Sequence, residues 1–159
     1  MLNQLENLSR EVDGRYASDA ELQFLEDYMR SFHLRMQTYQ KLQELEVTMV
    51  QQAYVKMRSA DASIFAGNNR EETNRKCQRD MVGSLRATAL TVLLDDPDAH
   101  QERFLLWLQS MMRSLGKEQT CNQLYTAYQE LAKQHLSPAQ AELVCPILEL
   151  NRRMTGTNP

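Results

Sequence analysis

From Ser18 to Met49 the chain reads SDAELQFLEDYMRSFHLRMQTYQKLQELEVTM. Its first four residues form a capping box, in which the Ser18 hydroxyl and the Glu21 carboxylate each satisfy a backbone N–H that the helix leaves unpaired. The apolar residues that follow recur at steps of three and four, which is the spacing of one helical face. No Gly or Pro occurs from residue 18 to residue 66, so this run predicts one very long helix or two helices joined by a bend. We expect the bend, near residues 45–48.

Two shorter helices are predicted on either side of this run. The first covers residues 3–12 and is ended by Gly14. A loop is expected at residues 66–69, where the chain reads Ala-Gly-Asn-Asn. After the loop, apolar residues at helical spacing predict a helix over residues 71–94.

The second half of the chain carries equally clear helix boundaries. Asp96-Pro97 starts a helix, since the Asp side chain caps it and Pro is tolerated at the first helical position; Gly116 stops it. Two more helices are expected over residues 118–134 and 137–153, and Pro146 should kink or shorten the last one. Six or seven helices with little else predict an all-α fold, namely a globin-like helical core with an N-terminal helical extension.

Composition and charge are those of an ordinary globular protein. The 159 residues (42% apolar and 25% charged) suit a single domain over residues 1–159. A net charge of −3 argues against a nucleic-acid partner, because such partners need clustered Lys and Arg. The start of the chain does not resemble a signal peptide, and the most apolar run, residues 104–108, is too short to span a bilayer. These features predict a cytoplasmic protein without a membrane span.

Nothing in the sequence indicates a catalytic or metal centre. The three cysteines lack metal-ligand spacing, and their odd number does not suit a disulfide framework. A haem ligand is not evident, because His100 lies too close to a helix start and His33 lies on the long first helix. Cys121 and Cys145 are interpreted as core residues, and Met111-Met112 as core filler in preference to an adaptable binding surface. We therefore expect no enzymatic activity.

The most informative segment is residues 76–80, which read KCQRD. On a helix, Cys77, Asp80 and Ser84 share one face. Arg79 projects about 160 degrees away from Cys77, but its length lets it reach a large ligand. This set would suit a linear tetrapyrrole, with the thiol forming a thioether, the carboxylate accepting pyrrole N–H groups and the guanidinium pairing with a propionate. From spacing alone, a surface charge cluster beside a partly buried Cys is the commoner arrangement.

Four segments together resemble the phycobiliproteins, the pigment-bearing subunits of the phycobilisome. The segments are Arg15-Tyr16-Ala17-Ser18 with Glu21-Leu22, the run Lys76-Cys77-Gln78-Arg79-Asp80, Leu85-Arg86 with Thr88, and Leu136-Ser137 with Ala139 and Ala141. The second segment looks like the family's bilin-attachment motif, Cys-x-Arg-Asp. The similarity extends from about residue 13 to about residue 150 with matching spacing.

The resemblance implies a role for each residue of the motif. Cys77 would carry a phycocyanobilin-type bilin through a thioether, Asp80 would hold the pyrrole nitrogens and Arg79 a propionate, with Lys76 assisting. The family also implies a globin-like core preceded by a helical pair that packs on a partner subunit. A light-harvesting subunit at the cytoplasmic face of thylakoid membranes follows as the expected function.

Subunit contacts are implied at three further positions. Asp13, Tyr16 and Arg86 fall where the family makes contacts between subunits. We therefore expect an oligomer or a complex subunit, with other phycobiliprotein-like subunits or photosynthetic proteins as partners through the N-terminal helices.

Several departures set this chain apart from ordinary phycocyanin or allophycocyanin subunits. Gly83 and Ser84 stand where the family usually has two tyrosines, Ala89 replaces a further one, and no tryptophan lies near residues 120–124. Without these rigid aromatic walls a bilin would be more flexible, or absent. The alternative is thus a pigment-free adaptor, assembly or regulatory factor of the photosynthetic apparatus, and a third is a stress-sensing regulator without pigment or haem.

Overall fold

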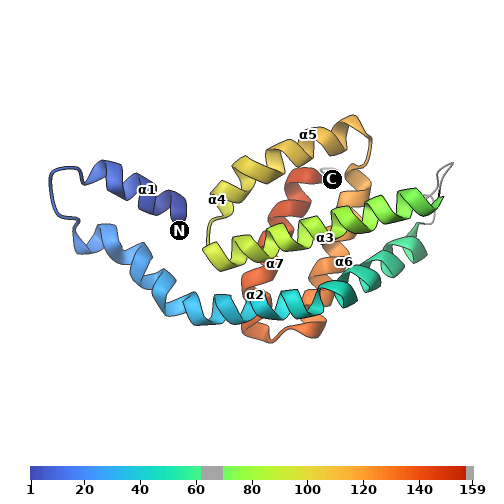
Figure 1. Cartoon of the computed structure of the whole chain (residues 1–159), viewed down its shortest axis with the longest axis horizontal. Helices are drawn as coiled ribbons and strands as arrows, with labels where there is room; N and C mark the ends of the chain where they lie inside the picture. Colours follow the sequence, from blue (N-terminus) through green and yellow to red (C-terminus); the bar gives the residue numbers. More distant parts are fainter. Residues whose placement is uncertain (62–69, 157–159) are drawn as a thin grey trace.

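The computed structural model describes residues 1–61 and 70–156, which form an all-helical protein (Figure 1). The helices are α1 (Leu2–Glu11), α2 (Asp19–Ala60), α3 (Arg70–Leu94), α4 (Pro97–His100), α5 (Leu106–Ser114), α6 (Glu118–His135) and α7 (Pro138–Thr155). A π-helical turn, Gln101–Leu105, joins α4 to α5, and no strand occurs in the described ranges. The predicted all-α, globin-like fold is confirmed. The loop expected at residues 66–69 lies outside the described residues.

The predicted helix boundaries depend on side-chain caps that the structure contains. The Ser18 side chain accepts from the backbone N–H of Glu21, whose carboxylate accepts from the backbone N–H of Ser18 at 2.8 Å. Ser137 forms the same reciprocal box with Gln140 at the start of α7. Asp96 caps α4 through its carboxylate. Each cap is worth about 1 kcal/mol, which fixes where the helices begin.

The prediction of a bend near residues 45–48 is wrong, because α2 is one unbroken helix of 42 residues that curves gradually and crosses α6 and α7 (Figure 1). Leu42 and Met49 lie on either side of the expected bend and are both buried in the core. Between them, Glu46 forms an ion pair with Arg86 of α3, with 2.6 Å between Oε2 and Nε. Packing therefore anchors the middle of α2 on α3, and no Gly or Pro is present to break it.

α1 and the first part of α2 form an N-terminal extension, defined here as residues 1–33, that lies beside the other helices (Figure 1). α1 contains no fully buried residue. Hydrogen bonds tie the extension to the rest of the molecule: the Met1 ammonium donates to the Asp95 carbonyl at 2.5 Å, the Asn3 N–H to the Asp96 carboxylate at 2.9 Å, and the Tyr28 hydroxyl to the Leu93 carbonyl at 3.1 Å. The extension is thus attached at its base, while most of its surface is exposed.

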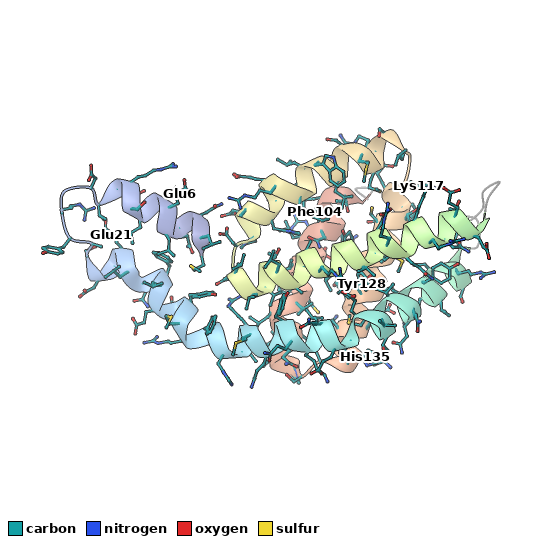
Figure 2. All side chains as sticks on the ribbon, in the orientation of Figure 1. Glu6, Glu21, Phe104, Lys117, Tyr128 and His135 are labelled. Carbon is teal, nitrogen blue, oxygen red and sulfur yellow. The ribbon has the colours of Figure 1, made fainter. Side chains whose placement is uncertain are left out.

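The core lies where the second half of α2 meets α3, α6 and α7. Large side chains such as Met49, Leu85, Tyr128 and Leu148 are almost fully buried there. Burying each of them stabilises the fold by about 1.5–3 kcal/mol, so this cluster supplies most of the driving force for folding. Tyr128 and His135 mark its position along α6 in Figure 2.

Two helix interruptions differ from expectation. The helix predicted from Asp96 to Gly116 is not uniform, because the π-helical turn inserts an extra residue into it. Pro146 does not shorten α7, which continues to Thr155. Both Pro146 and Glu142, the residue one turn earlier whose carbonyl loses its partner, are exposed, so water can satisfy that carbonyl.

A chain of buried polar groups crosses the core. The His100 Nε2–H donates to the Asn151 amide oxygen at 2.8 Å, and the Asn151 amide N–H donates to the Thr88 hydroxyl at 3.0 Å. Thr88 in turn donates to the Ser84 carbonyl at 3.0 Å. The chain satisfies groups that would be costly to bury alone, and it joins α4, α7 and α3.

Candidate functional site

A groove of about 530 Å³ lies between α3, α5 and α6, with Met57 of α2 at its end. This volume is in the range of small-molecule sites, about 300–1,000 Å³. Because Cys77 is one of its lining residues, we call it the Cys77 groove. It is the feature of the described residues that best fits a sizeable ligand, since its lining is mainly apolar with a few charged groups.

The wall on α3 contains all three site residues that the sequence singled out. Cys77, Arg79 and Asp80 line the groove together. Cys77 is half-buried, whereas Arg79 and Asp80 are exposed at the rim, with 3.8 Å between Arg79 Nε and Asp80 Oδ1. One turn of α3 therefore offers a thiol, a carboxylate and a guanidinium to the same space.

The thiol of Cys77 is strongly protonated. Burial, and after it the nearby Asp80 carboxylate, raise the pKa of Cys77 to about 11 against the opposing effect of Lys117. At pH 7 only about one thiol in ten thousand is then the nucleophilic thiolate. Cys77 is consequently placed for covalent chemistry but is unreactive until another group removes its proton.

The floor of the groove includes Tyr125 of α6 and Ser84 of α3, while Tyr128, one turn further along α6, lies in the core and does not line the groove. The Tyr125 and Ser84 hydroxyls lie 2.8 Å apart, and the Tyr128 hydroxyl donates to the Met81 carbonyl at 3.0 Å. Burial raises the pKa of Tyr125. Ser84 is itself buried, so the residue that replaces a family tyrosine is used to fix the floor.

The wall on α5 is apolar and was not predicted. It extends from the π-helical turn through α5 to its C-cap, and its residues, at helical spacing, are Phe104, Trp107, Leu108, Met111, Met112 and Leu115. Trp107 is 59% exposed, and its ring centroid lies 6.4 Å from that of Phe104. The interpretation of Met111-Met112 as core filler is incomplete, because both also line the groove. The helical spacing of these apolar residues in the sequence could have indicated an apolar face. It does not reveal which helix lies opposite that face.

Two residues of the turn into α6 complete the lining. Lys117 stands at the start of α6 (Figure 2), and Cys121 lies one turn further on. Cys121 is buried, as predicted for a core residue, yet it also borders the groove. Burial raises the pKa of its thiol. Neither residue could be assigned from sequence, because α3 and α6 come together only in the folded chain.

Most of the remaining candidates lie away from the Cys77 groove. Asp13 and Tyr16 are exposed in the extension, and Arg86 pairs with Glu46 on the opposite side of α3. His100 is buried against Asn151, so it contributes to the polar chain. Lys76 does line the groove, but its ammonium lies 2.7 Å from the Glu72 carboxylate.

Fold and site together define a class of protein: a globin-like helical core with an N-terminal helical extension and a ligand-sized groove beside a cysteine. A model of the phycobilisome protein family matches residues 8–153, and the chain belongs to that family. It is a phycobiliprotein-like subunit, and the family's proteins harvest light as oligomers within phycobilisomes. No curated protein matches the chain.

Membrane-spanning helices and metal-ligand clusters are two further features that would define a functional site. Over residues 1–61 and 70–156, no helix combines the length and hydrophobicity needed to cross a membrane. The same residues contain no cluster of His, Cys, Asp and Glu that could hold a metal ion. The Cys77 groove remains the strongest candidate.

Proposed function

We propose that this chain binds an open-chain bilin through a thioether at Cys77 and acts as a light-harvesting or phycobilisome-associated subunit. The observation that carries the proposal is the half-buried Cys77 at the edge of an apolar groove whose rim holds Asp80 and Arg79. A bilin is a long conjugated ligand with apolar faces, polar pyrrole N–H groups and acidic side chains. Each of these features has a matching group in the groove.

The proposed contacts follow from charge and position. The Asp80 carboxylate would accept hydrogen bonds from pyrrole N–H groups, and Arg79 would pair with a propionate. The rings would lie along the apolar wall of α5, with Trp107 against one ring face. Gly83 leaves open space in the α3 wall, since a Cβ there would meet nothing within 4 Å, so the pigment would be held less tightly than between two aromatic walls.

Attachment adds the thiol across an exocyclic carbon–carbon double bond of one pyrrole ring. The sulfur–carbon bond forms, the adjacent ring carbon gains a proton, and no group leaves. The raised pKa of Cys77 makes the uncatalysed step slow at neutral pH, because few molecules carry the thiolate. We therefore expect attachment to need a lyase or an alkaline medium.

The chain would act as one phycobiliprotein-like unit over residues 1–159, without enzymatic activity, at the cytoplasmic face of thylakoid membranes. Partner subunits would pack on the extension. Its exposed apolar side chains, Leu22, Met29 and Phe32, support such a contact.

The test is an absorption spectrum of the protein from its native host, followed by denaturing electrophoresis with zinc-enhanced fluorescence. We expect a visible band and fluorescence that stays on the polypeptide. Both should disappear in Cys77→Ala and remain in Cys145→Ala, a matched control because Cys145 is half-buried but does not line the groove. A colourless wild-type protein would overturn the proposal and leave the pigment-free adaptor.

A further inference from the structure

We propose that Lys117 is a positioning residue, which binds a carboxylate of the bilin from the α6 side of the Cys77 groove. The inference rests on the proposed function and adds a contact from the side opposite to Arg79. By this inference, a lysine outside the Cys-x-Arg-Asp motif makes the site prefer apolar ligands that carry an acidic group over neutral ones.

The backbone fixes the position of Lys117. Gly116 adopts a left-handed conformation, with φ 61°, which ends α5. The N–H groups of Gly116 and Lys117 then donate to the carbonyls of Arg113 and Met112 at 3.2 and 2.9 Å. Lys117 is therefore the N-cap of α6 on a hydrogen-bonded turn, and its ammonium lowers the pKa of Cys77 across the groove.

Among the cations that line the groove in the described part of the chain, Lys117 is the one without an acidic partner. The lining carries three cations, Lys76, Arg79 and Lys117, and one anion, Asp80, although the chain as a whole has a net charge of −3. Lys76 is engaged by Glu72 at 2.7 Å, and Arg79 lies 3.8 Å from Asp80. In the part of the chain that the structure describes, Lys117 has no carboxylate partner within 4.0 Å.

The wall on α5 is apolar, in contrast to the charged Lys117, and this contrast indicates the chemistry of the ligand. Trp107, Met111 and Leu115 present an apolar surface next to Lys117. A ligand that covers this surface and reaches the ammonium must be largely apolar with an acidic group at one side. A bilin with free propionates fits this description. Its dimethyl ester has the same apolar faces but no acidic group, so it serves as the neutral comparison.

The experiment uses the full chain in a Cys77→Ser background, so that binding is reversible. Phycocyanobilin and its dimethyl ester are titrated, and binding is followed by the fluorescence of Trp107, the chain's single tryptophan, and by visible absorption. We expect Lys117→Gln to weaken binding of the acid about tenfold and of the ester less than twofold, since one charge-assisted bond is lost. Lys117→Arg should restore most of the affinity, and Lys133→Gln, a control at an exposed lysine of α6 that does not line the groove, should change it less than twofold.

Each other result is decisive. If Lys117→Gln weakens the acid and the ester equally, its role is structural and the inference is wrong. If Lys133→Gln produces an equal selective loss, the effect is one of net charge and the inference is wrong. If the parent binds neither compound, the bilin function itself fails, and the role of Lys117 fails with it.

Discussion

The core and the extension differ in how much of each helix is buried. The four helical segments of the core bury large side chains to near-zero exposure, and a chain of hydrogen bonds pairs polar groups such as Asn151 and Thr88 inside them. The extension buries none of α1 and leaves Met29 65% exposed. A domain that needed the extension for its own stability would bury this apolar surface. The difference shows that the Cys77 groove is built on the core, whereas the extension leaves apolar surface exposed, as the proposed contact with other subunits requires.

The sharpest test compares two tyrosines. Tyr128 is fully buried and donates to the Met81 carbonyl, whereas Tyr16 in the extension is 98% exposed. Tyr128→Ala should lower the free energy of unfolding by about 3–5 kcal/mol, because it leaves a cavity and an unpaired carbonyl. Tyr16→Ala should change it by less than about 0.5 kcal/mol. Urea denaturation measures both, and similar losses for the two would contradict the division into core and extension.

A second test compares two asparagines. Asn151→Leu should cost about 2 kcal/mol of unfolding free energy, because the buried groups of His100 and Thr88 lose their partner. Asn7→Leu replaces an exposed residue of α1 and should leave the urea midpoint within error. Equal effects would mean that the polar chain through the core is not needed for stability.

The third prediction concerns pH. Burial lowers the pKa of His100 below its ordinary value of 6.5, so the unfolded chain binds the proton more readily than the folded one. The stability from neutral His100 is therefore complete above pH 6.5 and falls as the pH drops from 6.5 to the lowered pKa, by at most about 1.4 kcal/mol per unit.

This contribution is isolated by comparing unfolding free energies at pH 7.5, 6.5 and 5.5. The decline between the last two should be smaller in His100→Gln than in the wild type. His33→Gln, an exposed substitution in the extension, should retain the wild-type decline. An unchanged decline in His100→Gln would refute the role of His100.

The smallest expected effect on stability is at Met29. Met29→Ser should change the free energy of unfolding by less than about 0.5 kcal/mol, because the side chain is exposed. It should instead weaken association of the chain in sedimentation experiments, with Gln23→Ser, an exposed polar neighbour, as the control. A loss of stability without a change in association would mean that Met29 contributes to the stability of the fold, as core residues do, and not to contacts between subunits.

Features that depend on interactions within one or two helical turns could be predicted from the sequence. The caps at Ser18, Asp96 and Ser137 follow from side-chain hydrogen bonds within one turn, so they could be predicted. The wall on α3 was predictable for the same reason, because Cys77 and Asp80 share a face of one helix.

Features that depend on contacts between distant segments could not be predicted from the sequence. The bend in α2 is prevented by packing on α3, and the spacing of residues within α2 does not reveal that contact. Trp107 and Lys117 join the Cys77 groove only because the π-helical turn and Gly116 direct α5 and α6 towards α3. The roles of Cys77, Arg79 and Asp80 toward a bilin remain predictions for the spectrum to decide.

One consequence follows from the continuity of α2. At 1.5 Å per residue, its 42 residues span about 60 Å, from the cap in the extension to Met57 at the groove. A helix of that contour length is a lever even though it curves, and tilting one end by one degree displaces the other by up to about 1 Å. A partner subunit packed on the extension, as proposed, would therefore act on the same helix that borders the Cys77 groove, and assembly would have a mechanical path to the geometry of whatever the groove holds.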